Sequence, residues 1–186
     1  MKSGRFYLRN ATFEDLSMIL KWRNKTEVRN MMFNSNIIEM DEHVKWFKKV
    51  NMSGSSAETK IFFYDGIPYG VVNIYEIDSN NGTCRWSFYI GEEGAPAGLG
   101  KVLSFFAINY IFNDLKLQKL YAEVIEYNKK SYFLHKKLGF KQEGFLEAQK
   151  IKDGESINVY LFGLLKSSWH IRFKEINEII KRDFML

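Results

Sequence analysis

A loop with two glycines offers the most specific chemistry in this sequence. Gly98 and Gly100 lie between a strand-like run and a long apolar run that predicts a helix from about Gly98 to Asn113. The first backbone N–H groups of a helix lack partners within it and carry partial positive charge, so they can bind phosphate oxygens. Glycines let an anion approach the backbone closely. A tight turn explains the two glycines about as well as a phosphate site does, so the surrounding sequence must distinguish between these two interpretations.

That surrounding sequence fits neither of the two common nucleotide-binding loops. The dinucleotide fingerprint requires a third glycine where this chain has Leu103, and a P-loop requires a hydroxyl side chain where it has Val102. The runs before the loop also predict antiparallel strands, and both common nucleotide-binding folds therefore fit poorly.

Local patterns predict the strands and helices that must position this loop. The turns Asp65-Gly66 and Asn80-Asn81-Gly82 separate strand-like runs, which indicates an antiparallel meander. Strands are predicted at Phe6–Leu8, Lys60–Tyr64, Tyr69–Ile77, Thr83–Gly91, Lys119–Glu126, Phe140–Ile151 and Ile157–Lys166. Helices are predicted after the Thr12/Asp15 cap, from Asp41, and at Gly98–Asn113, Asn128–Leu138 and Trp169–Phe184. This order predicts an α/β (α+β) protein with a mixed central sheet and helices on both faces.

Composition sets the class and the compartment that we expect. The 186 residues are 46% hydrophobic with a net charge of +5, which suits one domain, residues 1–167 with a C-terminal helical extension at 168–186. The basic residues are scattered, so we expect no nucleic-acid partner, although the charge favours anionic small molecules. Without an apolar signal core or membrane-span run, a cytoplasmic protein with no membrane partner is expected. No metal-ligand spacing occurs, so no metal is predicted, and a homodimer stays open.

From Gly98 to Phe140 the chain resembles the cofactor half of the GNAT acetyltransferase superfamily. The matching features are the G-x-G that opens a helix, the strand after it, Asn128, and Leu138-Gly139-Phe140 at the family spacing. The resemblance implies the GNAT fold, with two splayed parallel strands that end near Ile90 and Glu126. It also implies acetyl-CoA as co-substrate, with its pyrophosphate at the glycines and its pantetheine arm in the splay. The implied cofactor contacts are Tyr89, Ile90, Gly98, Leu99, Gly100, Lys101, Val102, Asn128 and Ser131.

The N-terminal half narrows the resemblance to the PseH-type sugar acetyltransferases. The matching residues are Trp22-Arg23-Asn24, Val28-Arg29, Met32, Ile38 and Glu42-His43. The resemblance implies acetylation of the 4-amino group of a UDP-linked 4-amino-4,6-dideoxy sugar, the step that those enzymes perform in pseudaminic acid synthesis. Arg23 offers a planar fork for a diphosphate, and Met32, His43 and Trp46 are the other predicted substrate contacts. The alternatives are core packing for Met32 and Trp46, an ion pair for Arg23 and a helix cap for His43.

Two positions depart from the family pattern. Ala95 stands where the family usually has Gln or Arg, which removes one phosphate contact but no backbone amide. His135 stands where the family commonly has the tyrosine credited with protonating the departing CoA thiolate. With an unperturbed pKa of about 6.5, His135 is chemically suited to act as a general acid; the alternative is that it only fills the tyrosine's space.

The resemblance implies direct attack of an amine on the thioester, without an acyl-enzyme. Cys84, the only cysteine, is therefore expected to be buried packing in alternation with aromatic residues. Glu123 is the predicted general base, because it faces away from its apolar strand neighbours beside the implied splay and matches a glutamate of the PseH-type enzymes. Glu126 is the second choice. The alternative for either carboxylate is an ordinary exposed strand residue.

Two other functions stay open at this point. One is protein N-terminal acetylation of the RimJ/RimL type, whose enzymes share parts of the W-x-N and E-H patterns. The other is a noncatalytic GNAT-like module that binds CoA or nucleic acid. The intact glycine loop and the Glu123/His135 pair argue against the second.

Overall fold

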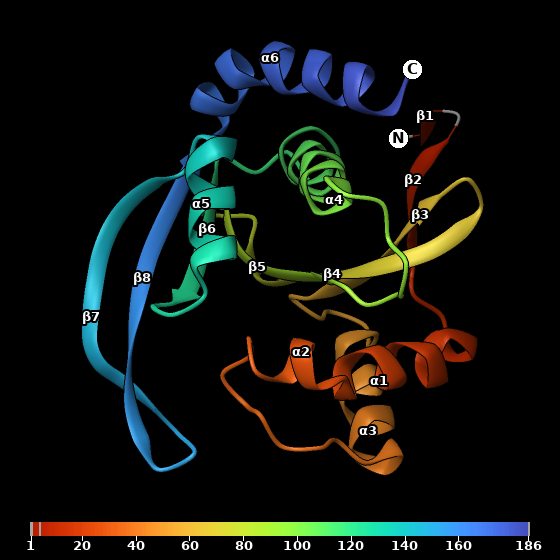
Figure 1. Cartoon of the computed structure of the whole chain (residues 1–186), viewed down its shortest axis with the longest axis vertical. Coiled ribbons are helices and arrows are strands. Elements are labelled where there is room, and N and C mark those ends of the chain that lie inside the picture. The colour runs from red at the N-terminus through yellow and green to blue at the C-terminus, as the bar shows by residue number, and fades with distance from the viewer. Residues whose placement is uncertain (1, 4, 186) are drawn as a thin grey trace.

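One eight-stranded sheet organises the computed structural model, which describes residues 2–3 and 5–185 (Figure 1). The strands are β1 (Lys2–Ser3), β2 (Phe6–Asn10), β3 (Glu58–Tyr64), β4 (Ile67–Asp78), β5 (Thr83–Ile90), β6 (Lys119–Ile125), β7 (Lys141–Lys152) and β8 (Glu155–Leu165). Their order across the sheet is β1-β2-β3-β4-β5-β6-β8-β7. Neighbours are antiparallel except β5 and β6, so the sheet is mixed, as predicted.

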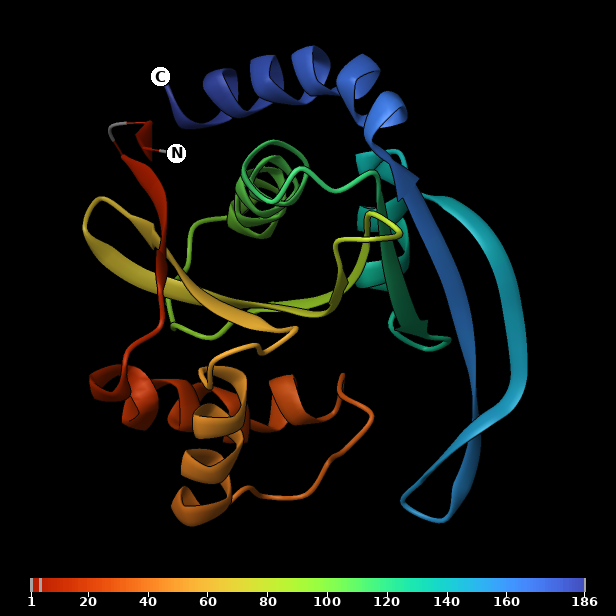
Figure 2. The ribbon, with the colours of Figure 1, turned by 180° about the vertical axis from the view of Figure 1, so that it is seen from behind.

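Helices cover both faces of this sheet, as Figures 1 and 2 show from opposite sides. One face carries α4 (Leu99–Asn109), α5 (Lys129–Leu138) and α6 (Lys166–Phe184). The other face carries α1 (Leu16–Asn24), α2 (Thr26–Arg29) and α3 (Met40–Val50). Each set of helices packs a buried hydrophobic cluster against the sheet. The predicted fold class is confirmed.

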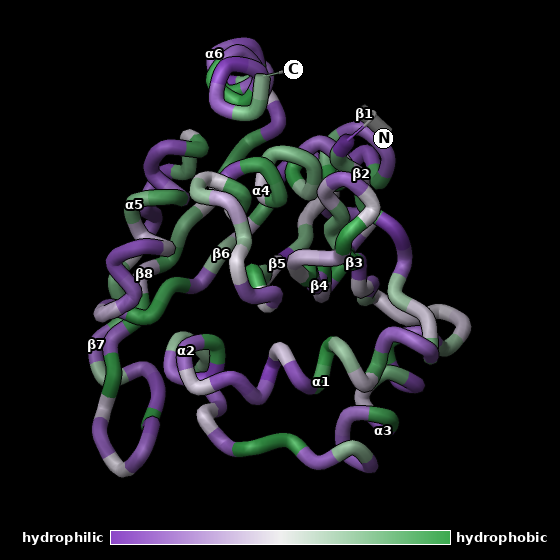
Figure 3. The backbone as a smooth tube through the Cα atoms, turned by 45° about the vertical axis from the view of Figure 1, so that its right-hand side comes forward, coloured by the Kyte–Doolittle hydropathy of each residue, from purple (hydrophilic) through white to green (hydrophobic). Residues whose placement is uncertain are grey.

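The central helix of the larger cluster is α4, where green hydrophobic stretches predominate in Figure 3. Every residue of α4 is buried except Gly100 and Lys101. A helix that is apolar nearly all round belongs in the interior of a domain. Its first turn is therefore the part that reaches the surface, and this turn carries the glycine loop.

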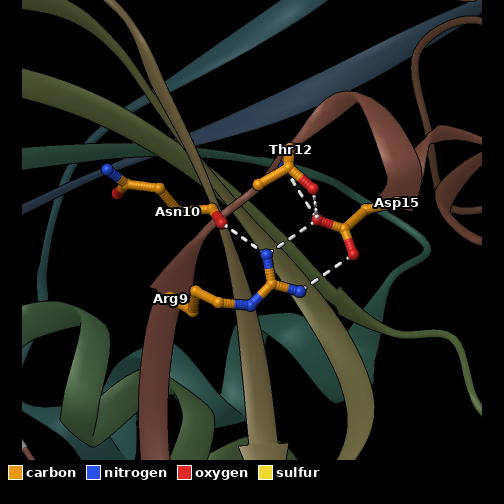
Figure 4. A network of polar contacts seen from close by, with 4 residues as sticks. All are labelled: Arg9, Asn10, Thr12 and Asp15. Atoms are coloured by element: carbon orange, nitrogen blue, oxygen red, sulfur yellow. Dashed lines mark hydrogen bonds and ion pairs between the residues drawn. The ribbon is translucent and has the colours of Figure 1, made fainter.

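Figure 4 shows how the chain turns from β2 into α1. Asp15 accepts a hydrogen bond from the backbone N–H of Thr12 at 2.7 Å and forms a two-pronged ion pair with Arg9, at 2.8 and 2.9 Å. Arg9 Nη1 also donates to the carbonyl of Asn10. A short 3-10 turn, η1 (Phe13–Asp15), leads into α1. The predicted Thr12/Asp15 helix start is therefore confirmed, with Arg9 as a partner that the spacing did not reveal.

The two parallel strands separate soon after they meet. β5 and β6 pair only at Thr83↔Lys119, Cys84↔Leu120 and Arg85↔Tyr121. From Trp86 onward β5 keeps its partner β4 but has no partner on the β6 side. The splay that the family resemblance implies is therefore present, and it begins at Arg85.

Several elements differ from the predictions in their bounds. The α-helical part of the predicted Gly98–Asn113 helix ends at Asn109, and a π-helical turn, η2 (Tyr110–Asp114), follows. α2 and β1 were not predicted, and α6 begins at Lys166, directly after β8. Within the described residues, no helix is long and apolar enough to cross a bilayer.

Candidate active site

The glycine loop has the geometry of an anion site. Gly98 is the N-cap of α4 and has a φ of 86°, a left-handed conformation that glycine adopts without strain. Among the described residues, the N–H groups of Gly98 and Gly100 have no acceptor. A Cβ placed on Gly100 would meet only Ile90 Cγ1, at 3.9 Å. The backbone is therefore free to bind an anion and open to its approach.

The other predicted cofactor contacts of the loop are Leu99, Lys101 and Val102. Their N–H groups are hydrogen-bonded within the turn, so they stabilise it and add no free donor. The N–H of Leu99 donates to Pro96 O at 3.2 Å, and those of Lys101 and Val102 donate to Gly98 O at 2.9 and 3.4 Å. The side chains of Leu99 and Val102 are buried in the core. Only the Lys101 side chain reaches outward, where it pairs with Asp183 at 3.2 Å.

The end of β5 lies beside this loop, where Ile90 Cγ1 is 3.9 Å from the position of a Cβ on Gly100. Ile90 pairs with Gly70 and Tyr89 with Val71 on the β4 side, so their opposite backbone edge has no strand partner. The Tyr89 side chain packs into the cluster of α1 and α3, and burial raises the pKa of its hydroxyl. Tyr89 therefore presents its backbone to the splay and its side chain to the face of the sheet that α1 and α3 cover.

Asn128 and Ser131 stand at the start of α5. Asn128 Oδ1 accepts a hydrogen bond from the N–H of Ser131 at 3.0 Å, which makes Asn128 the N-cap of the helix. Its Nδ2 has no acceptor among the described residues, so an amide donor remains for a ligand. Asn128 thus combines a structural role with a free donor at the splay.

His135 lies in an aromatic box below the splay. Its ring contacts Trp86, Phe88, Phe140 and Phe162, with ring centroids 4.8 to 5.9 Å apart. Burial lowers the pKa of His135 to about 4, so the ring is neutral at pH 7. Its Nδ1 lies 2.8 Å from Ser131 O and must carry the proton, because a carbonyl can only accept. Its Nε2 is then an acceptor, and it has no hydrogen-bond partner among the described residues.

This geometry favours the space-filling interpretation of His135 over the general acid. Nε2 has no proton to donate in the neutral ring, and the charged ring is disfavoured by burial. The acid role stays a prediction that the geometry does not support.

Glu123 lies on the sheet face that α1 covers, opposite its buried strand neighbours. Its Oε1 accepts a hydrogen bond from Arg85 Nη1 at 2.6 Å, at the point where the parallel pairing ends. Arg85 Nε also pairs with Glu76 at 2.8 Å. Oε2 of Glu123 has no partner among the described residues, so it is free to accept a proton. The alternation in β5 places Arg85 on the face away from Trp86, but only the fold shows that Arg85 meets Glu123.

Glu126, the second-choice base, has both carboxylate oxygens occupied by hydrogen bonds. Its two oxygens accept from the backbone N–H and the Nδ2 of Asn158, at 3.2 and 2.8 Å. Asn158 Oδ1 in turn accepts from the N–H of Ala148. Glu126 therefore holds the β7–β8 hairpin.

The predicted acceptor residues Arg23 and His43 share one positively charged region between α1 and α3. Arg23 Nη2 donates to Asn34 O at 2.8 Å, while Nη1 is buried and finds no partner within residues 5–185. Burial lowers the pKa of Arg23, and the nearby charge of Arg29 lowers it further. Burial and then Arg23 likewise lower the pKa of His43, whose Nε2 is also buried and has no partner in the described part of the chain. Trp46 stacks on His43 with ring centroids 5.0 Å apart.

Met32 is half-buried just after α2, and its N–H donates to Arg29 O at 3.0 Å. The segment 30–36 that follows α2 receives the surrounding cations on its carbonyl oxygens. Arg29 Nη1 donates to Ser35 O, and Lys152 Nζ, from the β7–β8 hairpin, donates to Asn30 O. The sequence pointed to Arg23 but not to the hairpin lysine, which is distant in the chain.

Trp22 of α1 and Lys25, the C-cap of α1, also hold the start of the glycine loop. Trp22 Nε1 donates to Glu92 Oε2 at 3.1 Å, and Lys25 pairs with Glu93 at 2.9 Å. A side chain on Gly91 would overlap the Trp22 ring. The helix that carries Arg23 and the loop that carries Gly98 are therefore joined through direct contacts.

Comparison with known proteins identifies the family of this fold and site. Residues 5–141 match the acetyltransferase (GNAT) domain. The chain belongs to the GNAT family. It is 28% identical over 127 residues to acetyltransferase PseH of Campylobacter jejuni, and the aligned region covers 68% of this chain and 77% of that relative. It is 25% identical over 169 residues to a spermidine N(1)-acetyltransferase of Vibrio cholerae, which covers 90% and 96%.

A solved GNAT structure shows the same fold. The crystal structure of spermidine N-acetyltransferase from Vibrio cholerae, in complex with CoA and spermine, matches with a TM-score of 0.82 at 22% identity. The match covers 90% of this chain and 99% of that one. The protein is an acetyl-CoA-dependent N-acetyltransferase, and the free N–H groups of Gly98 and Gly100 fit the cofactor's pyrophosphate. Within the described part of the chain, no group of acidic, His or Cys side chains is arranged to hold a metal ion.

Proposed function

We propose that this GNAT enzyme acetylates the amino group of a nucleotide-linked 4-amino-4,6-dideoxy sugar, with UDP as the nucleotide. Acetyl-CoA supplies the activated acetyl group, and both substrates are bound together before transfer. Arg23 and His43 bind the diphosphate, and Met32 and Trp46 line the site of the base or the sugar methyl group.

One observation carries this proposal: the predicted acceptor region holds cations that form no ion pair with a carboxylate among the described residues. Among the described residues, Arg23, Arg29 and Lys152 form no ion pair and donate instead to carbonyl oxygens or a hydroxyl. Burial is the main cause of the lowered pKa of Arg23, and the like charge of Arg29 lowers it as well. Such a group is stabilised by a ligand that brings negative charge, and a diphosphate matches the planar guanidinium fork.

The chemistry follows from the position of Glu123. Its free Oε2 accepts a proton from the substrate ammonium, directly or through a water, and leaves a neutral amine. The nitrogen lone pair attacks the thioester carbon, a C–N bond forms, and unpaired N–H groups of β5 stabilise the oxyanion. The C–S bond then breaks with its electron pair on sulfur. The nitrogen's second proton neutralises the thiolate, so the reaction needs no acid from His135.

Two other acceptor classes are the competing candidates. Spermidine is favoured by the relatives that match most of the chain, one of which was crystallised with spermine. A polyamine is a cation, however, and it would meet Arg23 and Arg29, which form no ion pair among the described residues. A protein N-terminus of the RimJ/RimL type lacks a diphosphate and would leave the same arginines unused.

A substrate panel tests the proposal. Purified enzyme with acetyl-CoA is given a UDP-4-amino-4,6-dideoxy sugar, the same amino sugar without nucleotide, spermidine, and peptides with free N-termini. We expect the highest kcat/KM with the nucleotide sugar and a large loss when the nucleotide is removed. A higher kcat/KM for spermidine or a peptide would overturn the acceptor assignment and leave the acetyltransferase activity intact.

A further inference from the structure

The C-terminal helix reaches the cofactor loop, although it lies outside the matched GNAT domain. In Figures 1 and 2 α6 runs across α4, with its last turn toward β2. Its first turns are anchored in the core, where Trp169 Nε1 donates to the buried Asn109 Oδ1 at 3.0 Å. Trp169 and Phe173 also pack on the ring of Phe105. The helix is therefore fixed to α4 at the end remote from the loop.

Its last turn is fixed at the loop itself. The Phe184 ring packs edge-on against Phe6, with ring centroids 5.3 Å apart, and Arg5 Nη1 donates to Phe184 O at 3.1 Å. The same ring lies 3.8 Å from the position of a Cβ on Gly98. Phe184 therefore forms a wall behind the left-handed turn that frees the loop N–H groups.

Asp183 brings a negative charge to this positive site. Its Oδ2 pairs with Lys101 Nζ at 3.2 Å, and Lys101 is the only side chain of the first turn of α4 that reaches outward. The ammonium of Lys101, and then Arg182, hold the pKa of Asp183 below its usual range, so Asp183 is ionised at pH 7. The two side chains are 28% and 33% exposed, and an ion pair with such exposure adds little to stability. A carboxylate beside a diphosphate site opposes the ligand's charge and occupies a cation that the ligand would attract.

We propose that Asp183 is a built-in competitor for Lys101 that sets the affinity of the cofactor site for acetyl-CoA and for CoA. Acetyl-CoA binding breaks the Asp183–Lys101 pair, and Lys101 turns to the cofactor's phosphates. After transfer, Asp183 takes Lys101 back and helps the equally anionic CoA to leave. Phe184 holds Asp183 in register with the loop. The inference rests on acetyl-CoA as co-substrate and is independent of the acceptor.

Calorimetric titration with acetyl-CoA and with CoA tests this competition. In Asp183→Asn, we expect both ligands to bind at least about threefold more tightly at low ionic strength, with the gain shrinking as salt screens the charges. Lys101→Met should weaken binding by a similar factor. Product inhibition by CoA should become stronger in Asp183→Asn, because release is slowed.

Two controls separate competition from a structural role. Glu178→Gln removes a matched ion pair with Lys181 on the same helix, away from the loop, and should leave both affinities unchanged. Asp183→Glu keeps the charge and should bind like the wild type. Unchanged or weaker binding by a folded Asp183→Asn variant overturns the inference. Loss of binding in Gly100→Val alongside that result would show that the cofactor loop is correct and the role of α6 is wrong.

Discussion

The proposed cofactor end and the proposed acceptor end of this enzyme present positive charge in different ways. At the cofactor end the charge comes from backbone N–H groups, which the left-handed turn at Gly98 keeps free. At the acceptor end it comes from the side chains of Arg23 and Arg29, which rest on carbonyl oxygens of the segment 30–36. The first site is preorganised, whereas the second must exchange partners when its ligand binds. The affinity for the cofactor should therefore depend on the backbone N–H groups that the glycines leave accessible. The affinity for the acceptor should depend on the hydrogen bonds to carbonyl oxygens that the arginines must break.

The largest effect is expected where the two ends meet, at Glu123. Glu123→Gln keeps the size of the side chain and an acceptor for Arg85 but removes the base. We expect kcat to fall by about 10²–10⁴-fold, with the KM for acetyl-CoA unchanged. Glu126→Gln is the matched control, and it should affect the hairpin and not the rate, because Glu126 bonds Asn158. Full kcat in Glu123→Gln, with chemistry rate-limiting, would place the base elsewhere.

The cofactor end alone should fail in Gly100→Val. The branched side chain blocks the approach of the pyrophosphate to the free N–H groups, and the loss of charged hydrogen bonds should weaken acetyl-CoA binding by about 100-fold. The melting temperature should change little, because a Cβ at this position meets only Ile90 Cγ1, at 3.9 Å. Gly100→Ala should give an intermediate affinity. Calorimetry on the folded variants measures this, and an unchanged Kd would rule out the loop.

The acceptor end alone should fail in Arg23→Ala. Loss of one charged hydrogen bond should raise the KM for the sugar nucleotide by about tenfold or more and leave acetyl-CoA binding intact. Lys21→Ala, an exposed residue on the same helix, is the control. A change in melting temperature without a change in KM would make Arg23 structural and erase the contrast between the two ends.

The smallest rate effect is expected at His135, because the geometry of its buried, neutral ring does not support a role as general acid. His135→Phe should lower kcat by less than about tenfold, whereas a general acid is worth about 10²–10⁴-fold. His135→Tyr, which restores the family's usual residue, should not exceed the wild type by more than that factor. A larger loss in the Phe variant, with both KM values unchanged, would restore the acid role.

The same residue predicts how stability depends on pH. The folded pKa of His135 is about 4, below its unfolded value of about 6.5, so the unfolded chain binds the extra proton first. The contribution is fully present above about pH 6.5 and is lost as the pH falls toward 4, by an amount on the order of 3 kcal/mol. Urea unfolding between pH 7 and 4 should show a shallower loss for His135→Phe than for the wild type. Equal pH dependence would mean that the ring is not buried as neutral imidazole.

Several backbone features were predictable from the sequence because single residue types favour them locally. The Asp65-Gly66 turn is left-handed at both residues, as its hairpin signal requires, and Asn128 caps α5. The alternation in β5 correctly places Cys84 and Trp86 in the core. The pairing of Arg85 with Glu123 and the tautomer of His135 were not predictable, because each depends on contacts between distant segments or on the exact placement of a carbonyl. The π-helical turn after α4 also leaves no local sequence signal that we recognise.

The splay between β5 and β6 has a mechanical consequence. Between β5 and β6, the block β1–β5 meets the block β6–β8–β7 through three residue pairs, the Arg85–Glu123 bridge and two hydrogen bonds that Gly82 O accepts from the N–H groups of Gln118 and Lys119. Beyond Arg85 no ladder joins β5 to β6 in the described residues, and we expect a bound pantetheine arm, which has amides of its own, to bridge this gap as a strand would. Backbone amides along both sides of the seam should then exchange hydrogen more slowly when acetyl-CoA is bound.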